Sequence, residues 1–276
     1  MKRESFGSRL GFILVSAGCA IGIGNVWKFP YICGAYGGAA FILIYLCFLV
    51  ILGIPVLVAE FAVGRGSHTS VAKCFDKLAP AGSGWKPLKF IGIIGCYMLM
   101  MFYTTVGGWM IYYCVKSLRG DFVGATPEAV TQSFSDMLGN APTMMLWMVI
   151  ICLIGFAVCF MGLQNGIEKI SKVMMSALLI IMVILAVHSV MMEGAGEGIR
   201  FYLIPDFQKI KEAGVGNVVF AALSQSFFTL SIGIGAMLIF GSYLDKSRSL
   251  TGEAVSITVL DTFVAPVSYT HLRAHE

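Results

Sequence analysis

The chain has 276 residues, of which 58% are hydrophobic and 12% are charged, and its mean hydropathy is +0.84. The charged share is about half that of an ordinary soluble domain, too small to cover a soluble surface of this size. The composition therefore argues against a soluble protein and favours one that lies in a lipid bilayer. The net charge of +4 comes from basic residues scattered between apolar runs, so it indicates no nucleic-acid partner.

Neither the cysteines nor the N-terminus indicates a secreted protein. The eight cysteines occur singly, without a CxxC pair, and suggest no disulfide framework or zinc site. The N-terminus is basic, but the apolar stretch after it is too long for the core of a signal peptide. We interpret it as a retained first helix.

Six apolar stretches of about 20 residues or more are long enough to cross the hydrocarbon layer as helices. Helices are expected because unpaired backbone groups are very costly in lipid. We place them near residues 10–34, 40–63, 89–115, 143–163, 168–192 and 217–243. A seventh stretch begins near Ala254 and loses its apolar pattern about a dozen residues later, too early for a complete span.

The Lys and Arg residues predict the orientation of these spans. With a cytoplasmic N-terminus, twelve of them lie in cytoplasmic segments and six on the opposite side, the bias expected of a membrane protein. We therefore predict a multi-pass protein of the cell (inner) membrane.

The C-terminal residues 266–276 differ in character from the rest. His271 and His275 are four residues apart, but they lack further candidate ligands for a metal. We predict a transmembrane transporter domain at residues 1–265 and a non-native tail at 266–276.

Two of the predicted spans contain residues that disfavour a continuous helix, since each glycine costs about 1 kcal/mol relative to alanine. In a transporter, paired breaks at corresponding places in two repeats indicate a binding site, where helix ends face an anion and freed carbonyl groups hold a cation. Alternatively, such glycines allow close helix packing. The first span contains Gly18, Gly22, Gly24, Asn25 and Pro30, and the sixth contains Ser224, Gln225, Ser226, Thr229, Ser231, Gly233 and Gly235.

The motif AGCAIGIGNVWKFP at residues 17–30, preceded by RLG at 9–11, resembles the first helix of the bacterial neurotransmitter:sodium symporters. Further matches are GIP at 53–55 with Glu60, Tyr103 with Trp109, and SQSFFTLS at 224–231. The resemblance covers residues 3 to about 265. It implies an all-α polytopic membrane protein, the N-terminal part of an inverted-repeat (5+5) sodium symporter fold with discontinuous helices 1 and 6, truncated after the start of the seventh transmembrane helix.

The resemblance also implies two sodium sites. One sodium ion would be held by the Ala20 carbonyl group and by the side chains of Asn25, Thr229 and Asp261. A second would use the carbonyl groups of Gly18 and Ile21, together with ligands from an eighth helix that this chain does not contain. From the residues alone, a carboxyl group inside an apolar run, as at Asp261, is a functional candidate.

The substrate site implied by the resemblance lies between the two breaks. Relatives that carry amines have aspartate at the position of Gly22, and glycine leaves room for a carboxylate, which favours an amino acid. On the residues alone, packed aromatic side chains are the favoured interpretation of Tyr103 and Phe228. The implied substrate-binding residues are Ala20, Gly22, Gly24, Leu99, Tyr103, Phe228, Thr229, Ser231 and Ile234.

Gating residues are implied as well. Lys28 stands where relatives have an arginine that closes the outer vestibule, while Arg3 and Tyr243 would close the cytoplasmic side, with Phe6 replacing a tryptophan. Glu60 is expected to accept hydrogen bonds from unwound backbone near the sixth-span break. In the fifth span, Ser176 replaces a common proline.

The sequence therefore predicts no enzyme, but a symporter that imports a neutral, apolar or aromatic amino acid with sodium ions. Chloride is not expected to be required, because Asp261 supplies a negative charge beside the first sodium ion. Two alternatives remain open: an amino-acid sensor that does not transport, and an inactive fragment of a transporter. The expected partners are the amino acid and the lipid bilayer, and the sequence leaves the oligomeric state open.

Overall fold

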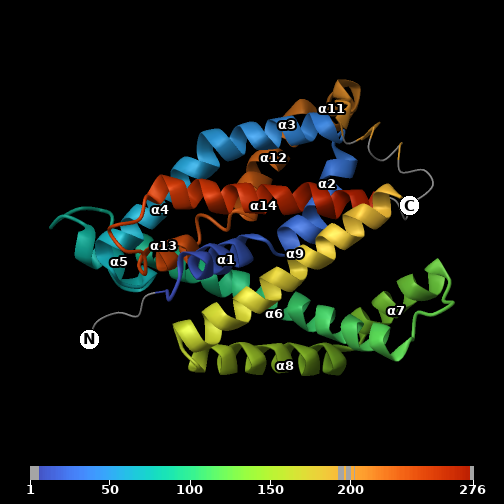
Figure 1. Ribbon diagram of the computed structural model, residues 1–276, viewed down its shortest axis with the longest axis horizontal. Helices are drawn as coiled ribbons and strands as arrows, with labels where there is room; N and C mark the ends of the chain where they lie inside the picture. The colour runs from blue at the N-terminus through green and yellow to red at the C-terminus, as the bar shows by residue number, and fades with distance from the viewer. Residues whose placement is uncertain (1–5, 192–195, 197–199, 202, 274–276) are drawn as a thin grey trace. The chain divides into compact units, whose positions relative to one another are not determined.

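The computed structural model describes residues 6–191, 196, 200, 201 and 203–273, and every regular element in these residues is a helix (Figure 1). The chain forms two compact units, one built from Met1–Gly92 and Leu163–Glu276 and the other from Ile93–Gly162. The second unit holds most of α6 (Leu88–Arg119), α7 (Pro127–Gly139) and α8 (Ala141–Phe160). The first unit holds α1 (Arg9–Ala20), η1 (Gly24–Lys28), α2 (Phe29–Ala35), α3 (Ala39–Phe48), η2 (Leu49–Gly53), α4 (Ile54–Ser67), α5 (Val71–Leu78), η3 (Leu163–Glu168), α9 (Lys169–Val190), α11 (Phe207–Ala213), α12 (Val215–Thr229), α13 (Ala236–Gly241) and α14 (Leu250–Arg273).

The long helices of the described residues match the first five predicted spans. Ala39–Ser67, α6, α8 and Leu163–Val190 are each long and apolar enough to cross a membrane, and α1 with the segment Gly24–Ala35 forms a bent fifth candidate. The sixth predicted span is divided between α12 and α13. The predicted all-α fold with discontinuous first and sixth helices is therefore confirmed.

Helix α14 differs in length from the expectation. It begins at Leu250, before the predicted start near Ala254, and continues to Arg273. The proposed domain boundary at residue 265 thus falls inside a helix, and the division into a native domain and a tail stays a prediction.

The first span is broken immediately after α1. Ser8 caps the start of α1 by accepting a hydrogen bond from the Gly11 N–H, as serine commonly does. The helix ends because Ile21 adopts an extended conformation with ψ of 92°. The helical segments on the two sides of this break are bent by 51°, so α1 and α2 are separate half-helices.

The sixth span is broken between Thr229 and Ala236, the end of α12 and the start of α13. Gly233 and Gly235 have φ values of 89° and 78°, and Ser231 has a φ of 51°. Glycine adopts such values without steric cost, whereas a serine in this region is uncommon and is often found at functional sites. The glycines noted in the sequence therefore interrupt the helix here.

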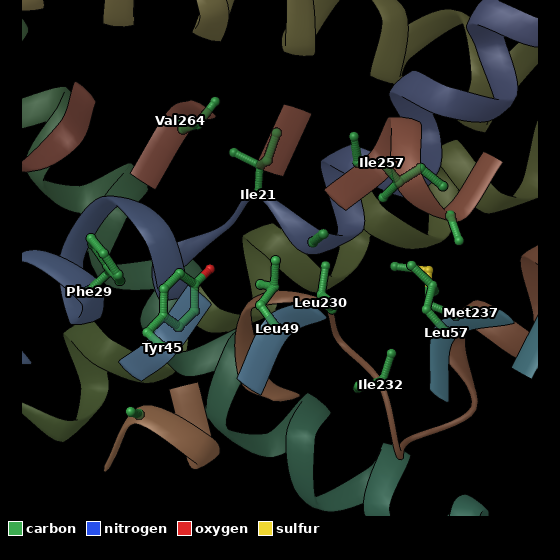
Figure 2. Close-up of a cluster of buried hydrophobic side chains, with 14 of the residues drawn as sticks. Ile21, Phe29, Tyr45, Leu49, Leu57, Leu230, Ile232, Met237, Ile257 and Val264 are labelled. Atoms are coloured by element: carbon green, nitrogen blue, oxygen red, sulfur yellow. The ribbon is translucent and has the colours of Figure 1, made fainter. Parts of the chain in front are cut away.

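The two breaks lie within the hydrophobic core of the first unit (Figure 2). Ile21 from the first break and Leu230 and Ile232 from the second are all buried in the same cluster of side chains. Phe29 and Tyr45 pack nearby with their ring centroids 5.2 Å apart. Apolar packing thus holds parts of both irregular segments in place.

Glycines also permit close packing within this unit. A Cβ atom at Gly241 of α13 would lie 2.6 Å from the Cα atom of Phe61 on α4. A Cβ atom at Gly64 would likewise collide with the Leu238 carbonyl oxygen. Helices α4 and α13 therefore approach each other backbone to backbone, which is the packing that small residues allow in membrane helices.

Candidate functional site

Three buried polar side chains from different helices meet beside the two breaks. Asn25 lies in η1, Thr229 is the last residue of α12, and Asp261 lies in α14; all three are fully buried. The Asn25 Nδ2 atom donates to Asp261 Oδ1 at 2.7 Å. The Thr229 hydroxyl lies 2.8 Å from Asn25 Oδ1 and 2.9 Å from Asp261 Oδ2.

The cluster of Asn25, Thr229 and Asp261 has more hydrogen-bond acceptors than protons to share among them, which favours a bound cation. The Thr229 hydroxyl has one proton, but two oxygen acceptors lie within hydrogen-bonding distance of it. The ionised Asp261 carboxylate would have only neutral side chains as its described hydrogen-bond partners. A buried charge without an opposite charge is unfavourable, and converging oxygen atoms are the ligands that hard cations prefer. The donor set therefore fits a sodium ion.

The end of α1 supplies further oxygen atoms. In the described part of the chain, no backbone N–H bonds to the carbonyl oxygens of Gly18, Ala20 or Ile21. This is the consequence of the break, because the residues that would donate to them no longer continue the helix. The carbonyl groups named in the sequence analysis are thus available to a ligand.

Hydrogen bonds tie the two breaks to each other. The Ser231 hydroxyl donates to the Cys19 carbonyl oxygen at 2.9 Å, and the Gln225 amide donates to the Gly24 carbonyl oxygen at 3.1 Å. The strained backbone of Ser231 therefore aims its side chain at the end of α1. Because Ser231 is committed to this bond, its expected place beside a substrate side chain stays a prediction.

The predicted role of Glu60 is confirmed. Its carboxylate accepts hydrogen bonds from the Gly233 N–H at 2.5 Å and from the Leu238 N–H at 3.2 Å. One donor lies in the second break and the other in the first turn of α13. Glu60 thus replaces helix partners that the unwound backbone has lost.

The space around the first-break glycines differs between them. Nothing lies within 4 Å of the position that a Cβ atom would take at Gly22, whereas at Gly24 such an atom would lie 2.9 Å from the Phe228 ring. The Lys28 ammonium lies over the same ring, 4.1 Å from its centroid, a favourable cation–π arrangement. The predicted outer gate residue and a predicted pocket residue are therefore in contact.

The remaining predicted substrate residues belong to both units of the chain. Ile234 lies in the second break, close in sequence to Ser231. Leu99 and Tyr103 lie one turn apart on α6, in the second unit. Their membership of the pocket stays a prediction.

The predicted cytoplasmic gate is described in part. Tyr243 packs edge-on against Phe6, with ring centroids 5.9 Å apart, and both line a pocket of about 240 Å³. Arg3 lies outside the described residues. Ser176 lies within the continuous helix α9.

Sequence reasoning assigned no role to three residues that hold the first span in place. Gln225 bridges the breaks, as described above. Glu168 accepts bonds from the Gly7 N–H at 2.8 Å and from the Ser8 hydroxyl at 3.2 Å, and Glu253 pairs with Arg9 at 2.9 Å. Both acids are buried near the start of long helices, and an acid in that position was the available signal.

Comparisons with known proteins agree with this geometry. The chain is 35% identical to the sodium-dependent transporter YhdH of Bacillus subtilis over 95% of the chain and 57% of the relative. It is 32% identical to a sodium-dependent transporter of Haemophilus influenzae over 96% of the chain and 59% of the relative. The chain therefore spans somewhat less than three fifths of the length of these curated relatives.

A solved structure and a family model complete the comparison. The crystal structure of MhsT in complex with L-phenylalanine matches with a TM-score of 0.89 and 36% identity, over 99% of this chain and 61% of that one. The model of the sodium:neurotransmitter symporter family matches residues 3–129 and 127–270. Members of this family are membrane symporters and not enzymes. Together with its broken helices, these matches show that the chain belongs to the sodium:neurotransmitter symporter family.

Proposed function

We propose that this protein is a sodium-coupled symporter and that Asn25, Thr229 and Asp261 bind one of its sodium ions with the Ala20 carbonyl group. The observation that carries the proposal is the convergence of their buried oxygen atoms beside the break after α1. The sodium-dependent relatives support it. A second sodium ion would use the Gly18 and Ile21 carbonyl groups, whose oxygen atoms lack backbone partners in the described residues.

The proposed substrate is a neutral amino acid with an apolar or aromatic side chain. The open space beside Gly22 suits a carboxylate, and the Phe228 ring offers an apolar wall. The L-phenylalanine in the MhsT complex supports this class. A substrate carboxylate beside the sodium ion would be attracted strongly in a site of low dielectric constant, which couples the binding of the two ligands. Leu99, Tyr103, Ser231 and Ile234 complete the proposed pocket.

Import would proceed with the N-terminus in the cytoplasm and the protein in the cell membrane, as the Lys and Arg distribution predicts. Lys28 is the proposed outer gate, and Arg3 and Tyr243 form the proposed inner gate. Chloride is not required in this proposal, because the Asp261 carboxylate supplies the negative charge beside the first sodium ion.

The sodium site can be tested at Thr229 with matched substitutions. Thr229→Val keeps the shape of the side chain and removes its oxygen atom, whereas Thr229→Ser keeps the hydroxyl. A bond to a charged group contributes about 1.5–3 kcal/mol, so we expect Thr229→Val to raise the sodium concentration for half-maximal phenylalanine binding by about tenfold or more.

The control is Ser226→Ala, because Ser226 is buried three residues away in the same helix and its hydroxyl donates to the Leu223 carbonyl oxygen at 2.7 Å. We expect Thr229→Ser and Ser226→Ala to keep the original sodium dependence. An unchanged sodium dependence in Thr229→Val would contradict the proposed site. Transport is tested separately by counterflow of labelled phenylalanine in proteoliposomes, where sodium-dependent binding without exchange would indicate a sensor.

A further inference from the structure

The segment between α4 and α6 is strongly basic. Residues 65–89 contain five Lys and Arg residues but one acidic residue, Asp76. Asp76 is already paired with Lys89, whose ammonium lies 2.7 and 2.9 Å from its two oxygens. The basic surface, as we name it, consists of Arg65, Lys73, Lys77, Lys86 and Lys89.

Helix α5 holds part of this basic surface in a fixed orientation. Val71 and Cys74 are buried against Leu238 of α13, so one face of α5 is packed on the transporter core (Figure 1). Lys73 and Lys77 are exposed on the outer face, and a spacing of four residues places them one above the other. The Lys77 ammonium also donates a hydrogen bond to the Ser67 carbonyl oxygen at 2.7 Å, which holds its charge at the end of α4.

Aromatic side chains indicate the depth of the segment in the membrane. Helix α4 ends at Ser67 and α6 begins at Leu88, so the segment joins the ends of two membrane-spanning helices. Trp85 is 62% exposed and Phe90 is 59% exposed. Tryptophan next to lysine at the end of a spanning helix is typical of the interface between hydrocarbon and water. The basic surface thus lies at the level of the lipid headgroups.

We propose that the basic surface binds the phosphate groups of anionic lipids. The excess of positive charge favours a negatively charged partner, and lipid phosphates are the anions present at this depth. Juxtamembrane groups of Lys and Arg are attracted to anionic leaflets. This inference depends on the membrane insertion of α4 and α6 and not on the proposed sodium coupling.

Trp85 is the probe for the test. The protein is reconstituted in vesicles of phosphatidylcholine and phosphatidylglycerol, with bromine on the acyl chains of one lipid or the other. Bromine quenches nearby tryptophan fluorescence, and subtracting the signal of Trp85→Phe isolates this side chain. We expect brominated phosphatidylglycerol to quench Trp85 fluorescence more strongly than its mole fraction in the vesicle would predict. This preference should decline as the salt concentration is raised.

Charge-neutral variants decide whether the lysines cause the preference. Each lysine near an anionic leaflet contributes about fivefold, so Lys73→Gln with Lys77→Gln should lower the preference by about tenfold or more. The control variant carries Lys209→Gln and Lys211→Gln in α11 and loses the same amount of positive charge. Asp206 and Glu212 lie close to these lysines in the sequence and balance their charge, so the control should keep the preference for phosphatidylglycerol. Equal quenching by both brominated lipids, or an equal loss in the control, would overturn the proposal. Sodium-dependent phenylalanine binding, measured in parallel, reports on the proposed function independently.

Discussion

Substitution of Glu60 tests whether a side chain supports the unwound part of the sixth span. Glu60→Ala removes the acceptor for both the Gly233 and the Leu238 N–H groups. Hydrogen bonds to a charged group contribute about 1.5–3 kcal/mol each, and the bond at the exposed Gly233 counts for less, so we expect a loss of about 2–4 kcal/mol. For a protein of this size such a loss lowers the Tm by about 4–8 °C.

The assay is thermal unfolding of the purified protein in detergent. After heating to each temperature, size-exclusion chromatography measures the amount of protein that remains monodisperse. Glu60→Gln retains one carbonyl acceptor and should show roughly half the effect. Glu212→Ala removes an exposed acid from α11, where its carboxylate accepts a hydrogen bond from the Gln208 side chain at 3.3 Å, and should leave the Tm unchanged. A Tm of Glu60→Ala within about 1 °C of the unsubstituted protein would refute the proposed support.

Three further outcomes are expected. Gly241→Ala should destabilise the protein by about 1–3 kcal/mol because the methyl group would meet the Phe61 backbone, whereas Gly216→Ala, with open space around it, should not; equal Tm values would contradict the close approach of α4 and α13. Gly22 also has open space beside it, so Gly22→Ala should keep the Tm of the unsubstituted protein. If a substrate carboxylate occupies that space, the added methyl group should weaken phenylalanine binding about tenfold or more. Unchanged affinity would place the carboxylate elsewhere. Uptake should persist when gluconate replaces chloride, since Asp261 supplies the negative charge, and strict chloride dependence would contradict that role.

Much of the candidate site could be predicted from local sequence. The glycines and polar residues of the two spans predicted the breaks, because a helix with several glycines is weak wherever it lies. Asp261 was identified since an acid within an apolar run requires a partner. The role of Glu60 followed from the same reasoning, combined with the resemblance to the symporters.

Other contacts could not be read from the sequence because they join distant residues. Glu168 is 161 residues away from Gly7, and Arg9 is 244 residues away from Glu253. Glu168 also pairs with Lys172, four residues further along, at 2.6 Å, but that local pair does not indicate the contact with Gly7. The bridge from Gln225 to the Gly24 carbonyl also requires both breaks to be formed already.

The sequence by itself determined that the chain crosses a membrane as helices and that two of them are interrupted, since both properties depend on composition and residue order within one segment. Only the tertiary structure decided which atoms meet at the interruptions. The packing of η1, α12 and α14 brings polar side-chain atoms of Asn25, Thr229 and Asp261 within hydrogen-bonding distance of one another. Such convergence depends on how the helices pack around the shared core, a property that no single segment carries.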